Sequence, residues 1–349
     1  MKTTLNQAAK WNLVRSKIDF KFWSGIAVST FFMVLLFRKV DFNQLLSALV
    51  KVDYRYILLA VVFTFVNYLL RAVRWYFLLI PEKRVPLSSL YPATIIGYMA
   101  NNLLPARLGE IVRAYVLAKK EGLQTPSVFA SLVIDRLFDG FTVILILLLT
   151  LFTMKLPHGM AEAETALQAG GAVTFVLYAC IIAFLFLLKN QAERTLRWIS
   201  VILKPFPQKL SDRIILLLSS FICGIRMSSK GVHVAAVLIS SLLIWLFCIL
   251  PIHFVLRGFE VHLPITASMF ILVLLVFAVM VPASPGYIGT YHYACFKGLS
   301  AFGIPESTAV SIALVVHATG FFPVIIAGLY YIWKSKLSLN DLQEVENTR

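Results

Sequence analysis

Apolar runs of about 20 residues recur from one end of the sequence to the other, and an α-helix of that length crosses the hydrocarbon core of a bilayer. Only 14% of the 349 residues are charged and 59% are hydrophobic, whereas a soluble domain carries about 25% charged residues. The pattern predicts an all-α polytopic membrane protein. No polar gap could hold a sizeable soluble domain, so we expect one membrane domain over 22–334, between a basic tail (1–21) and a polar tail (335–349).

Six of the runs are expected to be full spans, and two further stretches are interrupted. The expected spans cover about 22–38, 55–80, 126–153, 171–188, 233–256 and 307–333, and a short interfacial helix is expected at about 41–50. The interrupted stretches cover about 88–118 and 265–301. Asn101, Asn102 and Pro105 break the first, and Pro282, Pro285, Gly286 and Gly289 break the second.

The distribution of positive charge indicates the orientation of the chain. The formal net charge is +15; the 189–232 loop is strongly basic and the 155–171 loop is not. Basic loops face the cytoplasm, so both termini are expected to be cytoplasmic in a bacterial-type inner membrane. The charge is therefore expected to face anionic lipid headgroups, and no nucleic-acid partner is expected.

With this orientation, both interrupted stretches become re-entrant broken-helix hairpins that enter from opposite sides. The order span, span, hairpin, span then repeats upside down, in halves of about 22–154 and 171–334, which is an inverted repeat. Non-helical backbone at membrane depth persists only inside protein or beside a wet cavity. We therefore expect the two hairpins to line a polar chamber near the midplane.

Three groups of polar residues in the first half are candidates for a substrate site. They are Arg107, Glu110 and Arg113 after the first break, Asn67, Arg71 and Arg74 in the preceding span, and Asp135, Arg136 and Asp139 in the following span. On a helix beginning after Pro105, Glu110 could pair with either Arg107 or Arg113 and leave the other for an anion such as a lipid phosphate. Alternatively, these residues lie in the cytoplasmic interface and reach to water.

The other two groups also have structural interpretations. Arg74 lies close enough to the cytoplasmic end of its span to reach water, while Arg71 lies one turn deeper. Asp135 and Asp139 share one helix face and are natural counter-charges for Arg71 or Arg107. A structural ion-pair network is therefore as strong an expectation as a proton or substrate relay.

The second break offers hydrogen-bonding side chains and flexible backbone. The candidates there are Ser284, Gly286, Tyr287, Gly289, Thr290 and His292, with the amides Asn101 and Asn102 at the first break. The glycines allow close approach of a ligand, and His292 can change charge near neutral pH. A purely structural proline–glycine turn is the alternative. His317, alone in the last span, is typical of a satisfied core histidine.

No motif of an enzyme, a cofactor site or a metal site is present in the sequence. It has no Walker loop, HExxH or GxSxG, and its four cysteines (Cys180, Cys223, Cys248 and Cys295) lack ligand spacing. We expect the cysteines to be inert, and we expect no cofactor and no metal.

Taken together, these motifs resemble the flippase-like family built on the transmembrane region of lysylphosphatidylglycerol synthases. The resemblance rests on Gly109, Glu110 and Arg113, on the Asp135–Arg136 pair and on the turn from Ser284 to Gly289, and it covers about residues 20–335. Many relatives have a glycine and a carboxylate where this chain has Tyr287 and His292. The resemblance implies movement of lipids, including aminoacylated phospholipids, between leaflets. In the relatives called multiple peptide resistance factors an aminoacyltransferase domain follows, and no such activity is expected of the short tail here.

The leading hypothesis is a transporter, not an enzyme, that moves a lipid with an anionic headgroup held between the hairpins. One alternative is a membrane-embedded enzyme acting on lipid-linked substrates, with Glu110 or His292 as acid or base. Another is a structural partner of a separate lipid-modifying synthase.

Overall fold

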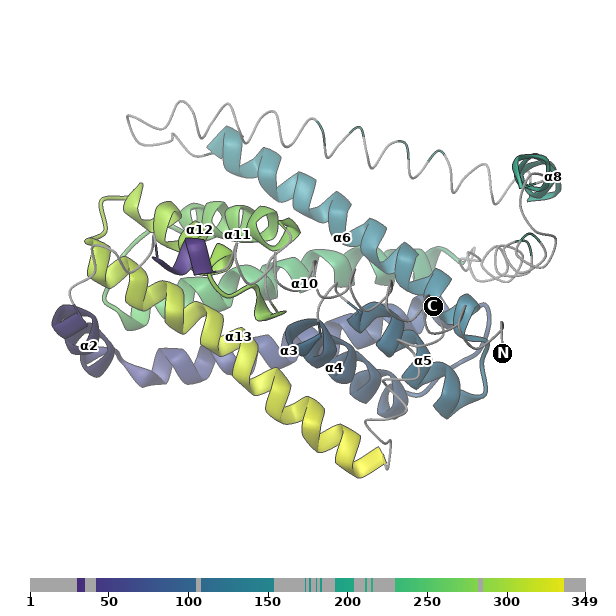
Figure 1. Ribbon diagram of the computed structural model, residues 1–349, viewed down its shortest axis with the longest axis horizontal. Helices are drawn as coiled ribbons and strands as arrows, with labels where there is room; N and C mark the ends of the chain where they lie inside the picture. The colour runs from purple at the N-terminus through teal and green to yellow at the C-terminus, as the bar shows by residue number, and fades with distance from the viewer. Residues whose placement is uncertain are drawn as a thin grey trace, which may run out of the picture.

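The computed structural model describes residues 30–34, 42–104, 108–153, 192–203, 230–281 and 285–335, together with six isolated residues between 173 and 215. Every regular element in this part of the chain is a helix (Figure 1). The helices are α2 (Phe42–Lys51), α3 (Tyr54–Leu79), α4 (Leu87–Leu103), α5 (Gly109–Glu121), α6 (Thr125–Thr153), α8 (Ala192–Ile202), α10 (Gly231–Gly258), α11 (Ile265–Met280), α12 (Thr290–Ser300) and α13 (Glu306–Ser335), with a 3-10 turn, η2 (Pro285–Tyr287).

Three of the described helices, α3, α10 and α13, are long and apolar enough to cross a membrane. They lie where spans were predicted at 55–80, 233–256 and 307–333, and α6 lies where one was predicted at 126–153. The described part of the chain is thus all-α, and its long apolar helices fit a multi-pass membrane protein. The predicted span at 171–188 and most of that at 22–38 lie outside the described residues.

Each interrupted stretch forms two short helices, and both breaks have the same local cause. Helix α4 is followed by Leu104 and α11 by Val281, and each of these residues has extended backbone (φ −97°, ψ 144° and φ −68°, ψ 130°). Each directly precedes a proline in the sequence. The proline ring disfavours the α-helical conformation of the residue before it, which favours a break at both positions, although Pro92, Pro251 and Pro323 are accommodated inside α4, α10 and α13.

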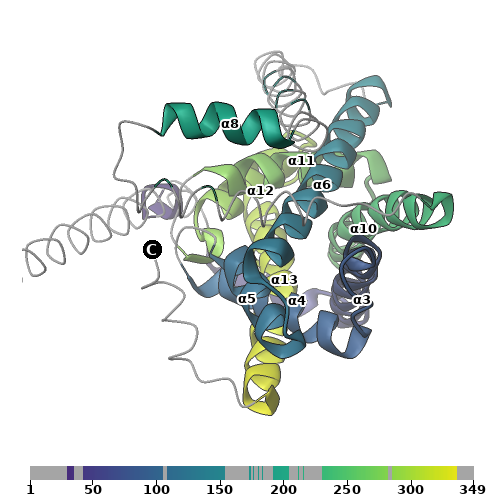
Figure 2. The ribbon, with the colours of Figure 1, turned by 90° about the vertical axis from the view of Figure 1, so that its right-hand side faces the viewer.

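The same order of helix lengths occurs twice along the chain. Helices α3 to α6 have 26, 17, 13 and 29 residues, and α10 to α13 have 28, 16, 11 and 30. The packing also recurs, because α3 lies along α10 while α13 covers α4 and α6 reaches α11 (Figure 2). The last long helix of each set therefore packs against the first short helix of the other.

Apolar side chains fill two clusters, each formed mainly by one set of helices and completed by residues of the other set. Trp75, Leu117 and Leu132 belong to the first, and Phe270 and Leu299 belong to the second; all five are almost completely buried. Burial of a large apolar side chain stabilises a fold by about 1.5–3 kcal/mol where water is the alternative. In a bilayer the same packing acts through close contact instead, because lipid is also apolar.

Close contact is greatest where α4 crosses α5. A Cβ atom added to Gly97 would lie 2.7 Å from the Cβ of Arg113 and 3.0 Å from the carbonyl oxygen of Gly109. A Cβ added to Gly109 would in turn collide with the carbonyl oxygen of Gly97. Only glycine at both positions lets the two short helices approach this closely, and this approach carries Arg113 into the interior.

Candidate functional site

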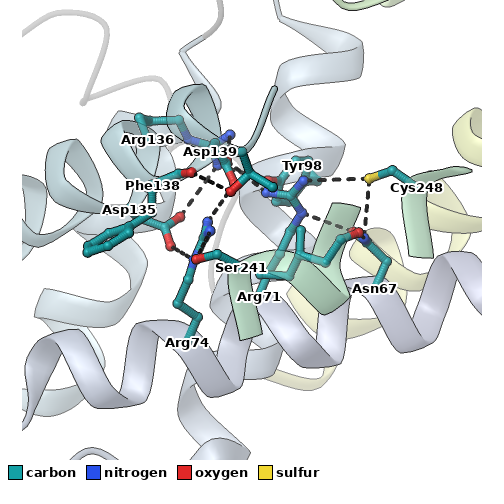
Figure 3. A network of polar contacts seen from close by, with 12 residues as sticks. Asn67, Arg71, Arg74, Tyr98, Asp135, Arg136, Phe138, Asp139, Ser241 and Cys248 are labelled. Carbon is teal, nitrogen blue, oxygen red and sulfur yellow. Dashed lines mark hydrogen bonds and ion pairs between the residues drawn. The ribbon is translucent and has the colours of Figure 1, made fainter. Parts of the chain in front are cut away.

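The most concentrated polar feature of the described chain is a cluster of charged side chains where α3, α5 and α6 meet. Figure 3 shows the part of it that lies between α3 and α6. We call it the arginine–carboxylate network, and its members are Arg71, Arg74, Glu110, Arg113, Asp135, Arg136 and Asp139. Sequence reasoning had placed these residues in three separate groups, and the fold brings them together. The four arginines exceed the three carboxylates by one positive charge among the described residues.

Arg74 occupies the centre of the network. Its Nε lies 2.7 Å from Asp135 Oδ1 and its Nη2 lies 2.8 Å from Asp139 Oδ1, while Nη1 donates to the hydroxyl of Ser241 at 3.1 Å. The side chain has no exposed surface. Of the two interpretations of Arg74, the one in which its side chain reaches water is wrong, because two carboxylates one turn apart on α6 hold it inside.

Arg71 lies one turn along the same face of α3. Its Nη1 lies 3.0 Å from Asp139 Oδ2, and its Nε donates to Asn67 Oδ1 at 2.9 Å. The predicted polar stripe on α3 and the pairing of Arg71 with an aspartate of α6 are both confirmed. Cys248 of α10, expected to be inert, lies beside this stripe and accepts a hydrogen bond from Asn67 Nδ2 at 3.3 Å.

Arg113 is buried and only partly satisfied. Its side chain is 1% exposed, and its guanidinium lies over the Trp75 ring at 4.0 Å from the centroid. Nη1 lies 3.4 Å from Asp135 Oδ2, whereas Nε and Nη2 find no hydrogen-bond partner among the described residues. Buried guanidinium donors without acceptors are costly, and these two atoms have the chemistry to donate to an anion.

The edge of the network is formed by Arg136 and Glu110. Arg136 Nε lies 3.4 Å from Glu110 Oε1, its Nη1 lies 3.0 Å from Asp139 Oδ2, and its Nη2 donates to the Tyr98 hydroxyl at 2.8 Å. Among the described residues Glu110 therefore pairs with Arg136 of α6 and not with Arg113, while the suggested pairing with Arg107 lies outside the described residues. Helix α5 begins at Gly109, with Leu108 as its N-cap residue.

The two amides at the first break have different roles. Asn101 Oδ1 accepts the backbone N–H of Gly109 at 2.8 Å, and its Nδ2 lies 3.4 Å from Glu110 Oε1. Asn101 therefore closes the break by satisfying an N–H at the start of α5. The carbonyl of Asn102 faces the second break, where a Cβ on Gly286 would lie 3.5 Å from it. The two interrupted stretches meet at this point.

The second break forms a smaller cluster with histidines. Gly286 has φ 74° and its carbonyl lies 2.8 Å from His317 Nε2. The backbone N–H of Gly289 points to His292 Nδ1 at 3.3 Å, and the Thr290 hydroxyl donates to the carbonyl of Tyr287 at 3.3 Å. The described candidates of the second stretch, from Gly286 to His292, therefore lie close together. Two predicted site residues, Arg107 and Ser284, lie outside the described residues.

Sequence reasoning missed four side chains that complete the network. They are Trp75, Tyr98, Ser241 and Cys248. The Tyr98 ring lies between two arginines, with Arg71 and Arg136 at 5.3 Å and 5.6 Å from its centroid. A signal existed for Trp75 and Tyr98, because an aromatic residue near buried arginines is a common cation–π partner. Across the described residues, no group of three His, Cys, Asp or Glu side chains could hold a metal ion.

Comparison with known proteins gives one family and several relatives. The family model described as the lysylphosphatidylglycerol synthase TM region matches residues 22–328. Two UPF0104 membrane proteins of Methanothermobacter thermautotrophicus are 28% identical over 249 residues (69% of this chain, 73% of theirs) and 25% identical over 266 residues (74% and 77%). The glycosyltransferase AglD of Haloferax volcanii is 25% identical over 277 residues, which are 71% of this chain and 43% of that protein. No solved structure matches the chain significantly.

Proposed function

Because the chain belongs to the family of the lysylphosphatidylglycerol synthase transmembrane region, we propose that it moves an anionic lipid from one membrane leaflet to the other. The lipid headgroup binds at the arginine–carboxylate network while its acyl chains remain in the bilayer. In this proposal the protein is a transporter and performs no chemistry on its lipid.

The observation that carries this proposal is the state of Arg113. Its Nε and Nη2 are buried without acceptors among the described residues, and an unsatisfied buried donor costs about 1–3 kcal/mol. A phosphate oxygen satisfies a guanidinium donor well, since the hydrogen bond joins opposite charges. The stacked ring of Trp75 holds the guanidinium plane in place for such a ligand.

The charge of the network suggests the kind of headgroup. Its described members carry one positive charge in excess, which a single phosphodiester would balance. A zwitterionic headgroup brings its own positive charge to a site that already holds four arginines. We therefore propose a preference for a lipid whose headgroup has a net negative charge.

The proposed mechanism uses the two sets of helices. We propose that the chain has about six full spans with α4–α5 and α11–α12 as re-entrant hairpins, in a single membrane domain over 22–334 with inverted halves. The repeated order of helix lengths and the contact between Asn102 and Gly286 support this arrangement. Rocking of the halves about that contact would expose the network to each leaflet in turn. We place the protein in a cytoplasmic membrane with both termini inside.

The proposal also extends to residues that the structure does not test as ligands. Arg107, which lies outside the described residues, and Arg136 would contact the headgroup beside Arg113. The second stretch, from Ser284 to His292, would form the opposite wall. The partners implied are membrane lipids, with a separate lipid-modifying synthase as a possible supplier.

Leaflet exchange in proteoliposomes tests the proposal. The purified full chain is reconstituted with fluorescent phosphatidylglycerol or fluorescent phosphatidylcholine, and dithionite bleaching measures how fast the inner-leaflet probe becomes accessible. Protein-dependent exchange that is faster for phosphatidylglycerol supports the proposal. Equal rates with and without protein, for both probes, would refute it.

Variants of α5 locate the site in the same assay. Arg113→Met should lose exchange, while Lys119→Gln, an exposed change on the same helix, should keep it. Arg113→Lys keeps a charge beside Asp135 and so protects against misfolding, but it lacks the guanidinium fork and should still be slow. Full exchange by a folded Arg113→Lys variant would remove Arg113 from the site.

A second candidate function is favoured by one observation, the similarity to glycosyltransferase AglD. In that case the chain would serve as a membrane module for an enzyme that acts on a lipid-linked substrate. A chemically changed lipid, detected by mass spectrometry after incubation with the purified protein or after co-expression with a transferase, would favour it. A transporter leaves its lipid unchanged.

A further inference from the structure

Two histidines lie at the second break, apart from the arginine–carboxylate network. The ring centroids of His292 on α12 and His317 on α13 are 4.6 Å apart, with an interplanar angle of 66°. His292 is 4% exposed. His292 ends the stretch proposed as the opposite wall of the lipid site, but that proposal gives no role to the protonation of either ring, so the pair requires its own account.

The backbone decides which nitrogen of each neutral ring carries hydrogen. The carbonyl of Gly286 can only accept, so His317 Nε2 must be the donor in their 2.8 Å contact. The N–H of Gly289 can only donate, so His292 Nδ1 must be an acceptor. Both neutral rings are therefore assigned, from their partners, as the Nε2–H tautomer.

These assignments make the two rings unequal toward an added proton. On His292 the proton would have to occupy Nδ1, which would break the hydrogen bond from Gly289. On His317 the proton would occupy Nδ1, which has no hydrogen-bond partner among the described residues, and the bond to Gly286 would be kept and strengthened by charge. Two imidazolium rings this close repel one another, so the pair takes one proton.

The surroundings of the pair contain few other titratable groups. Tyr291 of α12 lies 5.0 Å from His317, and within electrostatic range of Tyr291 are Cys248 of α10 and Tyr68 of α3. Helix α4 brings Tyr91 against Tyr331, about four turns away along α13. Helix α2 brings Gln44 to Ser307 near the start of α13, and the charged residue at its end is Lys51. Neither histidine makes an ion pair with a described carboxylate.

We propose that His317 is a proton-binding site, and that the proton it takes at Nδ1 couples to lipid movement by fixing the second break. The link is Gly286, which lies between His317, the Phe321 ring and the carbonyl of Asn102. A charged His317 holds Gly286 more tightly, and with it the contact between the two breaks. The coupling half of this proposal rests on the proposed function, and the proton site itself does not.

The proton site is tested by nuclear magnetic resonance of the full chain in nanodiscs with ¹⁵N-labelled histidine, titrated from about pH 4 to about pH 9. We expect Nδ1 of His317 to gain a proton in a single step while Nδ1 of His292 remains an acceptor. His317→Gln keeps a donor for Gly286 and cannot be charged, so the step should vanish. His292→Asn keeps an acceptor for Gly289 and should leave the step in place.

Two results would overturn the proton site: a His317 signal that does not change across the range, or independent protonation of both rings. The coupling is tested separately, by leaflet exchange of phosphatidylglycerol across the same range. The wild-type rate should change with pH, by up to about tenfold per pH unit, and His317→Gln should give a flat profile. A wild-type rate that does not depend on pH refutes the coupling. Absence of exchange throughout refutes the proposed function, while the titration still decides the proton site.

Discussion

Replacing Arg74 by methionine is the sharpest test of how the network holds the protein together. Methionine fills most of the same space without charge or donors. The change removes the two shortest contacts of the cluster, at 2.7 Å to Asp135 and 2.8 Å to Asp139. It also makes the described charges equal in number, with three arginines against three carboxylates. The balanced net charge therefore predicts that the variant is no less stable, whereas the lost local pairing predicts that it is less stable.

The loss of local pairing has the larger expected effect on the free energy of unfolding. Asp139 keeps Arg71 and Arg136 at 3.0 Å each, but Asp135 keeps only Arg113 at 3.4 Å and Arg136 at 3.8 Å. A buried charge that loses its main partner destabilises a protein by about 3–5 kcal/mol. An ordinary hydrogen bond between membrane helices contributes only about 0.6 kcal/mol. We expect a loss of unfolding free energy near the first figure.

The assay is equilibrium unfolding of the purified protein in mixed micelles, with a matched control on the same helix. Arg55 pairs with Asp53 at the same 2.8 Å, but its side chain is 91% exposed, so Arg55→Met should cause no measurable change. Adding Asp135→Asn to Arg74→Met should recover at least about 1 kcal/mol, because it removes the charge left without a close partner.

Two results would refute this expectation: an Arg74→Met variant as stable as the wild type, or a loss of unfolding free energy no larger than about 0.6 kcal/mol. Either result would mean that overall charge balance, or water inside the network, governs its stability. If Arg74→Met loses the expected unfolding free energy and Asp135→Asn does not restore part of it, the main partner of Arg74 is Asp139 and not Asp135.

Two further predictions concern packing and pH. Gly109→Ala should destabilise the protein by about 1–3 kcal/mol, because its methyl group would meet the carbonyl of Gly97, whereas Gly231→Ala, which has open space around it, should not; equal unfolding midpoints would contradict the close crossing. Lys83 Nζ lies 2.9 Å from Glu121 Oε2 at the end of α5, and this hydrogen bond lowers the pKa of the Glu121 carboxyl. The pair contributes fully to stability above the ordinary glutamate pKa of about 4.3, and this contribution is lost as the pH falls through the lower pKa of the folded state. The wild type should therefore lose more unfolding free energy on acidification than Lys83→Met. Parallel curves of stability against pH would refute this.

Much of the fold follows from the sequence, because its main signals are local. Apolar length located α3, α10 and α13, and the prolines after Leu104 and Val281 located the two breaks. A proline acts on its immediate neighbour, so no tertiary information was needed. The prediction of counter-charges on α6 also succeeded, because Asp135 and Asp139 lie one turn apart on a helix wherever it packs.

The partners within the site could not be read in the same way. Glu110 of α5 pairs with Arg136 because α5 packs against α6, and Arg74 of α3 is buried because α3 packs against α6, each pair of helices at its own angle. Such an angle depends on contacts between segments distant in the sequence. The role of Cys248 was missed for the same reason, since it depends on α10 lying along α3.

The burial of Arg71 and Arg74 also constrains how the chain is made. Both arginines emerge from the ribosome on α3, and their aspartate partners follow 61 to 68 residues later. At about 5–20 residues per second the delay is about 3 to 14 seconds. During that time both arginines lie on an isolated helix in lipid, where an arginine costs about 2.5–3.5 kcal/mol at the centre of the helix and less toward its end. We therefore expect α3 to remain at the translocon, or to lie near the bilayer surface, until α6 has been synthesised. The order of synthesis is then part of how this membrane protein assembles.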